Sequence, residues 1–399
     1  MPSVTGYSAG TETTDVVLSY GLETAWGVLP AVAFKDLRIT SETLARNKQR
    51  ARFNEIQGKR QVSPSVTQQE SAAGAINFNL SYGTQDDLFA CLLGNDWTTA
   101  LAIDGIGADI STVAAGNKLT STLAGKFTNI VAGQYIRLYG FTASAGANNG
   151  IYRVAAKNSA IDLTLAGKTV ANETPAGTTA KVRGSMLRNG DLVMSAYVQK
   201  RLASTRLFTY PGTVFSSGTL RGGVGQAFTG SVNAMAQQEG FVTVDQSTGA
   251  HTAAPTGGFF NAVASFGGVQ LNDTAIDAVV QNINLSLNRE GAEMDYGMGS
   301  AFGQGARWGQ LNPGGTLEVL FRNESIYTLF AAETQRLISW TMRDPQDNAY
   351  AVSMPAAVLM NGSPQAGGPN QTVRSSFTIE GAQDLSTFAI QIDRFPAVP

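Results

Sequence analysis

The sequence predicts a mainly β protein in which one domain, built of strands and a single helix, occurs twice. Residues 75–82 alternate between apolar and polar side chains, which is the period of a strand with one buried face. The apolar residues of 88–93 fall on one face of a helix. Residues 74–94 can be placed on residues 315–335 without a gap, and the same strand–turn–helix pattern recurs. This recurrence indicates an internal duplication.

The repeat extends beyond this unit in both directions. An alternating strand at 34–44 precedes the first unit, and its counterpart at 279–290 precedes the second. After the units, residues 214–235 resemble residues 358–379, with valine and glycine at matching places. We therefore expect each half to consist of a strand, a long loop, a strand, a helix, further strands, a Gly-rich turn and a last strand.

Residues that favour helix ends flank both predicted helices. Thr84, followed three residues later by Asp87, is a capping-box pattern, and Gly94 suits the C-terminal end of the first helix. In the second unit, Asn323 or Ser325 can cap the helix.

The two halves differ by an insertion of about 90 residues after the first helix. It contains short alternating segments at 133–141, 149–157 and 160–168, separated by turns rich in Gly, Asn and Ala. We predict a small all-β module whose two ends lie close together in the host domain, as they do in tolerated insertions.

Domain boundaries follow from the repeat and the insertion. The first domain is predicted to comprise residues 1–97 and 186–239, with the inserted module at 98–185 between them. Residues 240–268 are a predicted linker, and residues 269–399 are the predicted second domain.

Charge and composition exclude several classes of protein. Lys and Arg number 28 and Asp and Glu 30, so the net charge is −2, too low for the many phosphate contacts of a tight nucleic-acid binder. The single cysteine, Cys91, excludes an internal disulfide and is expected in the core. The N-terminal segment lacks the features of a signal peptide, and no apolar run is long enough to cross a membrane. We expect a protein made in a cytoplasm, without a membrane partner.

Few residues suggest catalysis. The single histidine, His251, lies in a Gly- and Ala-rich segment and is predicted to be a solvated linker residue. Asp86 and Asp87 fall in the first turn of a helix, where the helix dipole explains them. The glycines of 297–305 match neither phosphate-binding motif and lie in a predicted hairpin loop. We therefore predict that the protein is not an enzyme and has no catalytic, cofactor-binding or metal-binding residues.

The two long loops of the repeat differ in charge. The loop of the first copy is basic, with Arg46, Lys48, Arg50, Arg52, Lys59 and Arg60. The loop of the second copy is acidic, with Glu290, Glu293 and Asp295. Two interpretations remain open. Either both loops are solvated hairpin tips, or loops of opposite charge meet on different subunits and fix their register.

Several of these stretches, in this order, resemble the major tail tube proteins of long non-contractile-tailed bacteriophages. They are LSYGLETAWGVLPA, LRITSETL, GKRQV, GAINFNLSYGTQDDLFACLLG, AGGPNQTVRSSFTIEGAQD and TFAIQIDRFP. The resemblance implies a β-sandwich or partial-barrel domain with a flanking helix. It also implies rings whose inner strands join into a continuous barrel and stack into a tube for DNA. By position, loops 46–72 and 288–313 match the loop that contacts the next ring.

The same resemblance implies the partners and the location of the protein. Two domains per chain favour three chains in a ring of six domains, and six chains per ring are the alternative. The expected partners are further copies of the chain, a tape measure protein, tail terminator and distal tail proteins, and double-stranded DNA that passes without tight binding. The inserted module is expected on the outside of the tube, and the protein in the virion tail after synthesis in the host cytoplasm.

Two other functions remain as alternatives. A tandem-β-domain adhesin that binds host-surface carbohydrate would need an exposed aromatic platform and metal-binding Asp clusters, and the sequence shows neither clearly. An enzyme such as a glycosidase is the third alternative.

Overall fold

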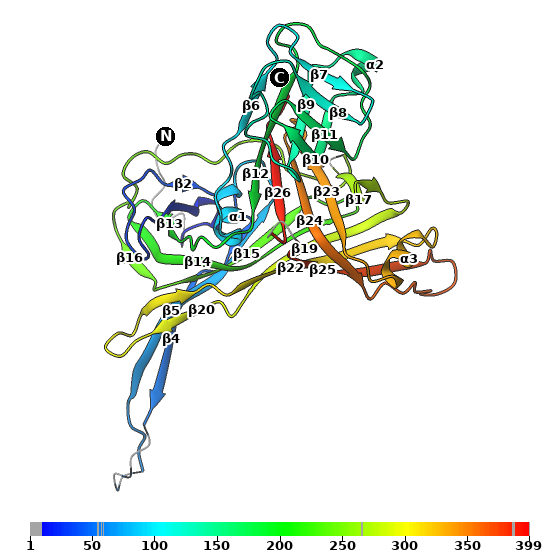
Figure 1. Cartoon of the computed structure of the whole chain (residues 1–399). Helices are drawn as coiled ribbons and strands as arrows, with labels where there is room; N and C mark the ends of the chain where they lie inside the picture. Colours follow the sequence, from blue (N-terminus) through cyan, green and yellow to red (C-terminus); the bar gives the residue numbers. More distant parts are fainter. Residues whose placement is uncertain are drawn as a thin grey trace, which may run out of the picture.

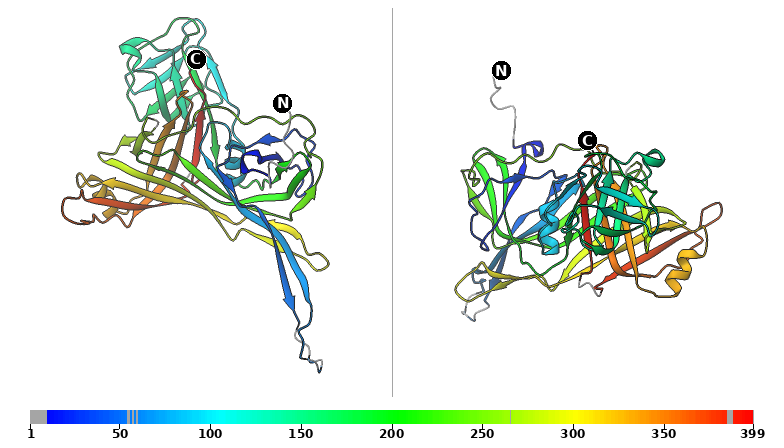
Figure 2. Two further views of the ribbon diagram at one scale, coloured as in Figure 1. Left: turned by 180° about the vertical axis from the view of Figure 1, so that it is seen from behind. Right: turned by 45° about the horizontal axis from the view of Figure 1, so that its top comes forward.

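The computed structural model describes residues 10–398, except residues 54, 55, 57, 59, 265 and 385–387. The chain is mainly β, with 51% strand and 5% helix, which confirms the predicted fold class. The strands fall into a first group, an inserted group and a second group along the chain. Figures 1 and 2 show the inserted group at one end and a long hairpin at the other.

The first group surrounds helix α1 (Asp86–Leu93), and a short 3-10 helix, η1 (Thr13–Asp15), precedes it. Its strands are β1 (Val17–Leu22), β2 (Lys35–Asp36), β3 (Ser41–Glu42), β4 (Ala45–Arg52), β5 (Ser65–Asn79), β13 (Ala196–Ala203), β14 (Arg206–Gly223), β15 (Thr229–Ala236) and β16 (Gly240–Val242).

The second group contains helix α3 (Ser325–Ala331). Its strands are β17 (Phe266–Leu271), β18 (Thr274–Ala275), β19 (Val279–Glu290), β20 (Glu293–Tyr296), β21 (Gly303–Arg307), β22 (Gln310–Leu320), β23 (Arg336–Arg343), β24 (Ala349–Met360), β25 (Arg374–Ala382) and β26 (Gln391–Phe395).

The two groups share one main sheet, which is antiparallel throughout (Figure 1). Its strand order is β4, β5, β15, β14, β19, β22, β25 and β24. The pairing of β14 with β19 joins the first group to the second. One face of the sheet carries the apolar residues of the main core, because apolar and polar side chains alternate along each strand.

The groups also agree in strand order and register. The order β5, β15, β14, β13, β1 in the first matches β22, β25, β24, β23, β17 in the second. Asn47 pairs with Ser71, and Asn288 pairs with Asn312, so both partners shift by the same 241 positions as the sequence repeat. These pairings support the predicted duplication.

The helices confirm one predicted end and correct the others. Gly94 is in the left-handed conformation, and its N–H donates to the carbonyl of Ala90, as a C-terminal cap requires. The capping-box prediction is wrong: the helix begins after Gln85, no side chain caps it, and the Thr84 hydroxyl bonds Ser81 instead. Helix α3 begins after Glu324, also without a side-chain cap.

Two phenylalanines at matching positions of the two helices, 241 residues apart, each pack against another aromatic ring. Phe89 of α1 meets Phe78 edge-on, with ring centroids 6.4 Å apart, and is 6% exposed. Phe330 of α3 meets Phe377 at 6.1 Å, but it is only half-buried. Helix α1 therefore lies deeper in the molecule than α3.

The inserted group has its own hydrophobic core, separate from that of the main sheet. It consists of β6 (Leu101–Asp104), β7 (Ile110–Val113), β8 (Lys118–Ser121), β9 (Tyr135–Tyr139), α2 (Ala143–Gly146), β10 (Gly150–Ser159), β11 (Asp162–Ala166) and β12 (Lys181–Arg188). The two ends of this group lie side by side, because Leu101 pairs with Gly184. Strand β12 then continues past the module and pairs with β26.

The inserted group rests on the second group, although it interrupts the first in sequence. Arg153 of β10 forms an ion pair with Asp273, and Arg137 of β9 forms one with Asp347. The N–H of Tyr135 also donates to the carboxylate of Asp393. These contacts cross from residues of the first half of the sequence to residues of the second.

We expect Gly94→Ala to lower the free energy of unfolding by about 2 kcal/mol or more. The left-handed backbone disfavours any side chain, and a Cβ here would lie 2.1 Å from the Trp308 ring. Urea denaturation measures the change. Gly249→Ala is the control, because a Cβ there meets nothing within 4 Å, and it should change stability by less than about 0.5 kcal/mol. Equal stability of the two variants would contradict this account.

Candidate assembly interface

The face of the main sheet opposite the core, called here the open face, is polar. Its side chains are exposed or half-buried, and Ser, Thr and Asn predominate. They include Ser71, Asn77 and Asn79 of β5, Thr229, Ser231 and Asn233 of β15, Ser217 and Thr219 of β14, Asn282, Asn284, Ser286 and Asn288 of β19, Asn312 and Thr316 of β22, and Ser376 and Thr378 of β25. Charges are few and of both signs, and Arg374 pairs with Glu318 at 2.9 Å. This face has little capacity to hold an anion.

Both ends of the main sheet are unpaired edges within the described part of the chain. Strand β4 pairs with β5 along one side only. At the other end, residues Ala356–Met360 of β24 pair with β25 on one side, while β23 covers the opposite side only as far as Ala357. Unpaired edges present backbone N–H and C=O groups that can bind another strand.

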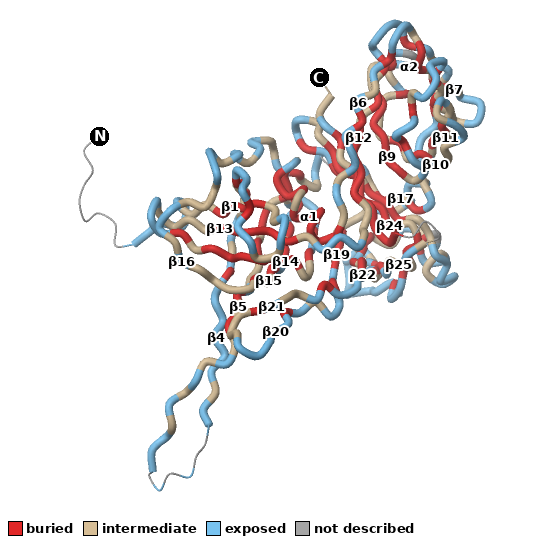
Figure 3. The backbone as a smooth tube through the Cα atoms, turned by 60° about the vertical axis from the view of Figure 1, so that its left-hand side comes forward, coloured by how far each residue is buried: buried red, intermediate tan, exposed pale blue. Residues whose placement is uncertain are grey.

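The basic residues predicted in the first loop lie on a hairpin of β4 and β5 that projects from the body (Figures 1 and 3). Arg46 and Lys48 bind Glu70 of the same hairpin, and the Arg46 hydrogen bond lowers the pKa of the Glu70 carboxyl despite its burial. Arg50 donates to the carbonyl of Ser65 at 2.8 Å. Arg52 and Arg60 are exposed further out, and Lys59 lies outside the described residues.

The acidic residues of the second loop are also exposed. Glu293 and Asp295 both lie on β20 and bind Arg307 of β21, and the Asp295 bond measures 2.9 Å. Glu290 accepts a hydrogen bond from the side chain of Asn312 at 3.1 Å. Part of the negative charge of this loop is therefore neutralised within the chain.

The structure places the two loops of one chain next to each other. The N–H of Glu70, at the base of the projecting hairpin, donates to the carbonyl of Ala301 in the β20–β21 turn at 2.7 Å. Gln49 pairs with Gln69 and Glu290 with Gln310, so the two loops contain the same number of residues. The first continues straight outward, whereas the second turns aside, as the β20–β21 hairpin, toward the base of the first.

A buried carboxylate connects helix α1 to the second group. Asp86 accepts hydrogen bonds from the Tyr350 hydroxyl and the Arg394 guanidinium, and both donors belong to the second group. Asp87 binds Lys35 at 2.6 Å and the Tyr20 hydroxyl at 2.8 Å. The prediction that the helix dipole alone explains these two carboxylates is therefore wrong.

The other end of α1 meets strand β19. The guanidinium of Arg289 donates to the carbonyl of Leu92 at 2.7 Å and lies over the Trp308 ring, 3.3 Å from its centroid. Burial lowers the pKa of Arg289 to about 10, so the group remains charged near neutral pH. A cation at this place also favours the negative end of the helix dipole.

His251 is not a solvated linker residue, which corrects the sequence prediction. Its ring nitrogens lie 2.7 Å from the Asp36 carboxylate and 3.0 Å from that of Asp245, and its side chain is 13% exposed. Burial alone would lower the pKa of His251, but the hydrogen bonds to Asp36 and Asp245 outweigh burial and raise it. The segment that carries His251 is therefore attached to the first group.

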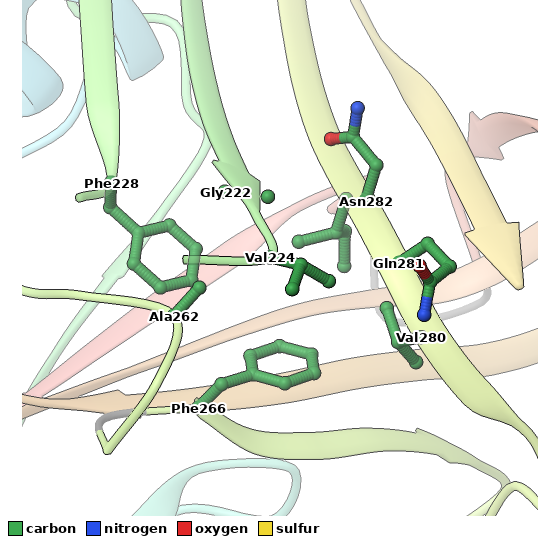
Figure 4. A pocket seen from close by; sticks show the side chains of 10 residues that line it. Gly222, Val224, Phe228, Ala262, Phe266, Val280, Gln281 and Asn282 are labelled. Atoms are coloured by element: carbon green, nitrogen blue, oxygen red, sulfur yellow. The ribbon is translucent and has the colours of Figure 1, made fainter. Parts of the chain in front are cut away.

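The described residues contain no group of three or more His, Cys, Asp or Glu side chains that could hold a metal ion. In the same part of the chain, no helix is both long and apolar enough to cross a membrane. A pocket beside the β14–β19 pairing, lined by Val224, Phe228, Phe266 and Val280 among others, has a volume of about 30 Å³ (Figure 4). It is far too small for a substrate or cofactor.

Sequence reasoning missed two parts of this interface. It did not single out the unpaired edges. The 241-residue offset of the repeat aligns β4 with β19, and β19 has a partner on both sides whereas β4 has one on a single side. It also missed the contacts of Asp86 with Tyr350 and Arg394, for which the sequence carries no local signal because the partners are more than 260 positions away.

Comparison with known proteins identifies a matching family. A family model described as phage tail tube protein matches residues 13–381 of the chain. No curated protein matches it.

We expect the pKa of His251, measured by NMR titration, to lie above the usual value of 6.5. Because the pKa is raised in the folded state, protonation stabilises the fold below the unfolded pKa, and this contribution is lost as pH rises through the folded pKa. The unfolding free energy of the wild type should therefore be higher than that of His251→Gln, and this difference should be larger at about pH 6 than at about pH 9. Asp36→Asn should lower the measured pKa. A wild-type pKa at or below 6.5 would contradict the two-carboxylate arrangement.

Proposed function

Since this chain belongs to the phage tail tube protein family, we propose that its copies join edge to edge into rings that stack into a DNA-conducting tube. The family membership itself makes the protein a structural component of the virion tail. The further steps, ring closure, stacking and passage of DNA, are argued below from the main sheet and its loops.

The observation that carries this proposal is the junction of β14 with β19 inside one chain. Ser217 of β14 and Met360 of β24 occupy matching places in the two groups. Ser217 is linked to Ala75 of β5 by one residue of β15 that pairs with both. Met360 is linked in the same way, through one residue of β25, to Thr316 of β22. Thr316 lies 241 positions after Ala75, which is the offset of the repeat. Strand β14 pairs with β19 from Ser217 to Gly223, whereas β24 ends at Met360, the match of Ser217, where it pairs only with β25.

The partner of that unpaired edge follows from the same correspondence. Ser217 pairs with Asn288, and Asn288 of β19 matches Asn47 of β4, which is the other unpaired edge. Met360 of one copy therefore pairs with Asn47 of the next copy, in the register of the internal junction. Such a head-to-tail contact closes into a ring when the rotation per repeat fits a whole turn.

Two matching groups per chain favour three chains, and so six groups, in a ring, with six chains as the alternative. The open face would line the lumen, because the inserted group and both helices lie on the other side of the main sheet (Figure 1). Few Lys or Arg residues on this face, against many Ser, Thr and Asn, let DNA pass without tight binding. The inserted group then lies on the outside of the tube.

The loops are proposed to connect successive rings. The projecting hairpin carries Arg50, Arg52 and Arg60 exposed, whereas Glu290 and Glu293 are exposed on the other loop. Opposite charges on the two loops favour contact between a hairpin of one ring and the acidic loop of the next, and so fix their relative rotation. Tape measure protein in the lumen, and tail terminator and distal tail proteins at the tube ends, complete the proposed partners.

Oxidised Asn47→Cys/Met360→Cys protein should form disulfides between chains. Opposed residues of antiparallel strands have Cα atoms about 4.5–5.5 Å apart, which is within disulfide range. Denaturing gels should show a ladder that ends at three chains for a trimer or at six for a hexamer, and negative-stain microscopy should show rings or tubes of uniform width. The native Cys91 is buried and does not compete.

Two controls fix the register. Ser217→Cys/Asn288→Cys should cross-link within one chain and remain monomeric on the gel, because these residues pair internally. Arg52→Cys/Met360→Cys places the thiols five residues out of register and should not cross-link. A persistent monomer at high concentration, without cross-links in the Asn47 and Met360 variant, would refute ring closure and favour a single-subunit function such as an adhesin.

Reversing the charge of the hairpin by Arg50→Glu with Arg52→Glu should impair stacking of rings into tubes. Both side chains are exposed, so the unfolding free energy should change by less than about 0.5 kcal/mol. Electron microscopy of tube length gives the readout. Lys168→Glu with Lys181→Glu makes the same charge change on the inserted group and should leave tubes intact. Tubes of normal length from the Arg50 and Arg52 variant would disprove the role of the hairpin charge.

A further inference from the structure

The two helices of the repeat differ sharply in exposure. In α1, every residue from Leu88 to Leu93 is buried. The helix packs on β14 of its own group and on β12, and side chains of the second group bind both of its ends, at Asp86 and Leu92. In α3, Leu329 and Phe330 are only half-buried, and Tyr327 is 39% exposed. Helix α1, which has the second group of the same chain beside it, is thus buried. Helix α3, at the open end of the chain, is partly exposed.

The second-group side chains that bind the start of α1 come from one face of β24 and β26. Tyr350 and Arg394 on this face hold the Asp86 carboxylate. Val352 and Ile392, two positions from them and therefore on the same face, pair with each other and are 1% and 3% exposed. Both belong to the core that contains α1.

The matching face of the first group is partly exposed. Phe208 lies six residues before Val214, just as Val352 lies six residues before Val358, and Phe208 pairs with Phe241 of β16 as Val352 pairs with Ile392. Phe241 is 58% exposed, and the two rings stack edge-on with centroids 5.4 Å apart. The place that is buried in the core in the second group thus holds a half-buried Phe208 and an exposed Phe241 in the first.

The C-terminal end of the helix has a matching partner as well. Arg289 binds the carbonyl of Leu92 at the end of α1. The offset of 241 residues assigns a counterpart to each of these two residues. Lys48 of β4 corresponds to Arg289, and Glu333, just after α3, corresponds to Leu92. Glu333 and Lys48 are both exposed and of opposite charge.

We propose that helix α3 of one copy packs on the Phe208–Phe241 pair of the next copy, with Lys48 of that copy beside Glu333. This contact rests on the proposed ring closure and adds a second, outer layer to it. We expect the partner that packs on the aromatic pair to be a second copy of this chain. The contacts of α1 with the second group give the model for this packing, and α3, the matching helix, is still partly exposed at the open end of the chain. Apolar rings at the centre of an interface with a charged pair at its edge suit specific self-association.

The test uses the Asn47→Cys/Met360→Cys protein and measures the concentration at which half of it is cross-linked. Adding Phe241→Asp should raise this concentration about tenfold or more, because it places a charge at the centre of the contact. Ile106→Asp, at an equally exposed apolar residue of the inserted group, is the matched control and should leave it unchanged. Urea denaturation should show equal stability of the two variants.

Charge exchange tests the edge of the same contact without altering the aromatic pair. Lys48→Glu should weaken cross-linking a few-fold, as should Glu333→Lys, and the two together should restore it toward the starting value. If Phe241→Asp cross-links like Ile106→Asp and the charge exchange gives no recovery, while Asn47 and Met360 still cross-link, the α3 contact is wrong and ring closure stands. If the parent protein does not cross-link at all, ring closure fails and the α3 contact with it.

Discussion

The backbone pairing of β14 with β19 is the constraint on which the rest of the structure depends. It joins two groups of strands into one sheet, so the open face is continuous and both helices lie on the other side of the sheet. A shift of one residue would turn every side chain of β19 to the wrong face, moving Leu285 out of the core and Asn284 into it. The register therefore fixes the sheet, the core and the place of each unpaired edge at once.

Much of the fold follows from local patterns in the sequence. Alternation along 279–290 predicted a strand correctly, because a half-buried strand leaves that period in the chain. The strand predicted at 75–82 ends at Asn79, and the one predicted at 34–44 is only the two short strands β2 and β3. The Gly94 cap was predictable for a similar reason, since a left-handed residue favours glycine. The Thr84 cap was not, because its hydroxyl bonds a neighbour that only the folded turn brings near. Local sequence patterns thus predict the presence of a strand or helix better than the residues at which it begins and ends.

Contacts between distant segments set the limit of sequence reasoning. His251 looked like a solvated residue because its carboxylate partners, Asp36 and Asp245, are identified only when the segment folds back on the first group. Asp86 looked like an ordinary first-turn carboxylate, yet burial would make its charge costly without Arg394 and the Tyr350 hydroxyl. For the candidate interface, the charges of the loops were visible in sequence, but their internal partners were not.

The sideways turn of the second loop has a consequence for symmetry. Gly291 and Gly309 both have positive φ, and a Cβ at Gly309 would lie 2.1 Å from the carbonyl oxygen of Glu290, so only glycine fits this turn. The first loop has Arg and Gln at the matching places and runs straight. A ring of three such chains would have pseudo-sixfold symmetry in its wall but only three projecting arms. Such a ring maps onto itself only after a rotation of a third of a turn. A ring could therefore bind the next one in three equivalent orientations about the tube axis, half the number that a true sixfold ring would allow.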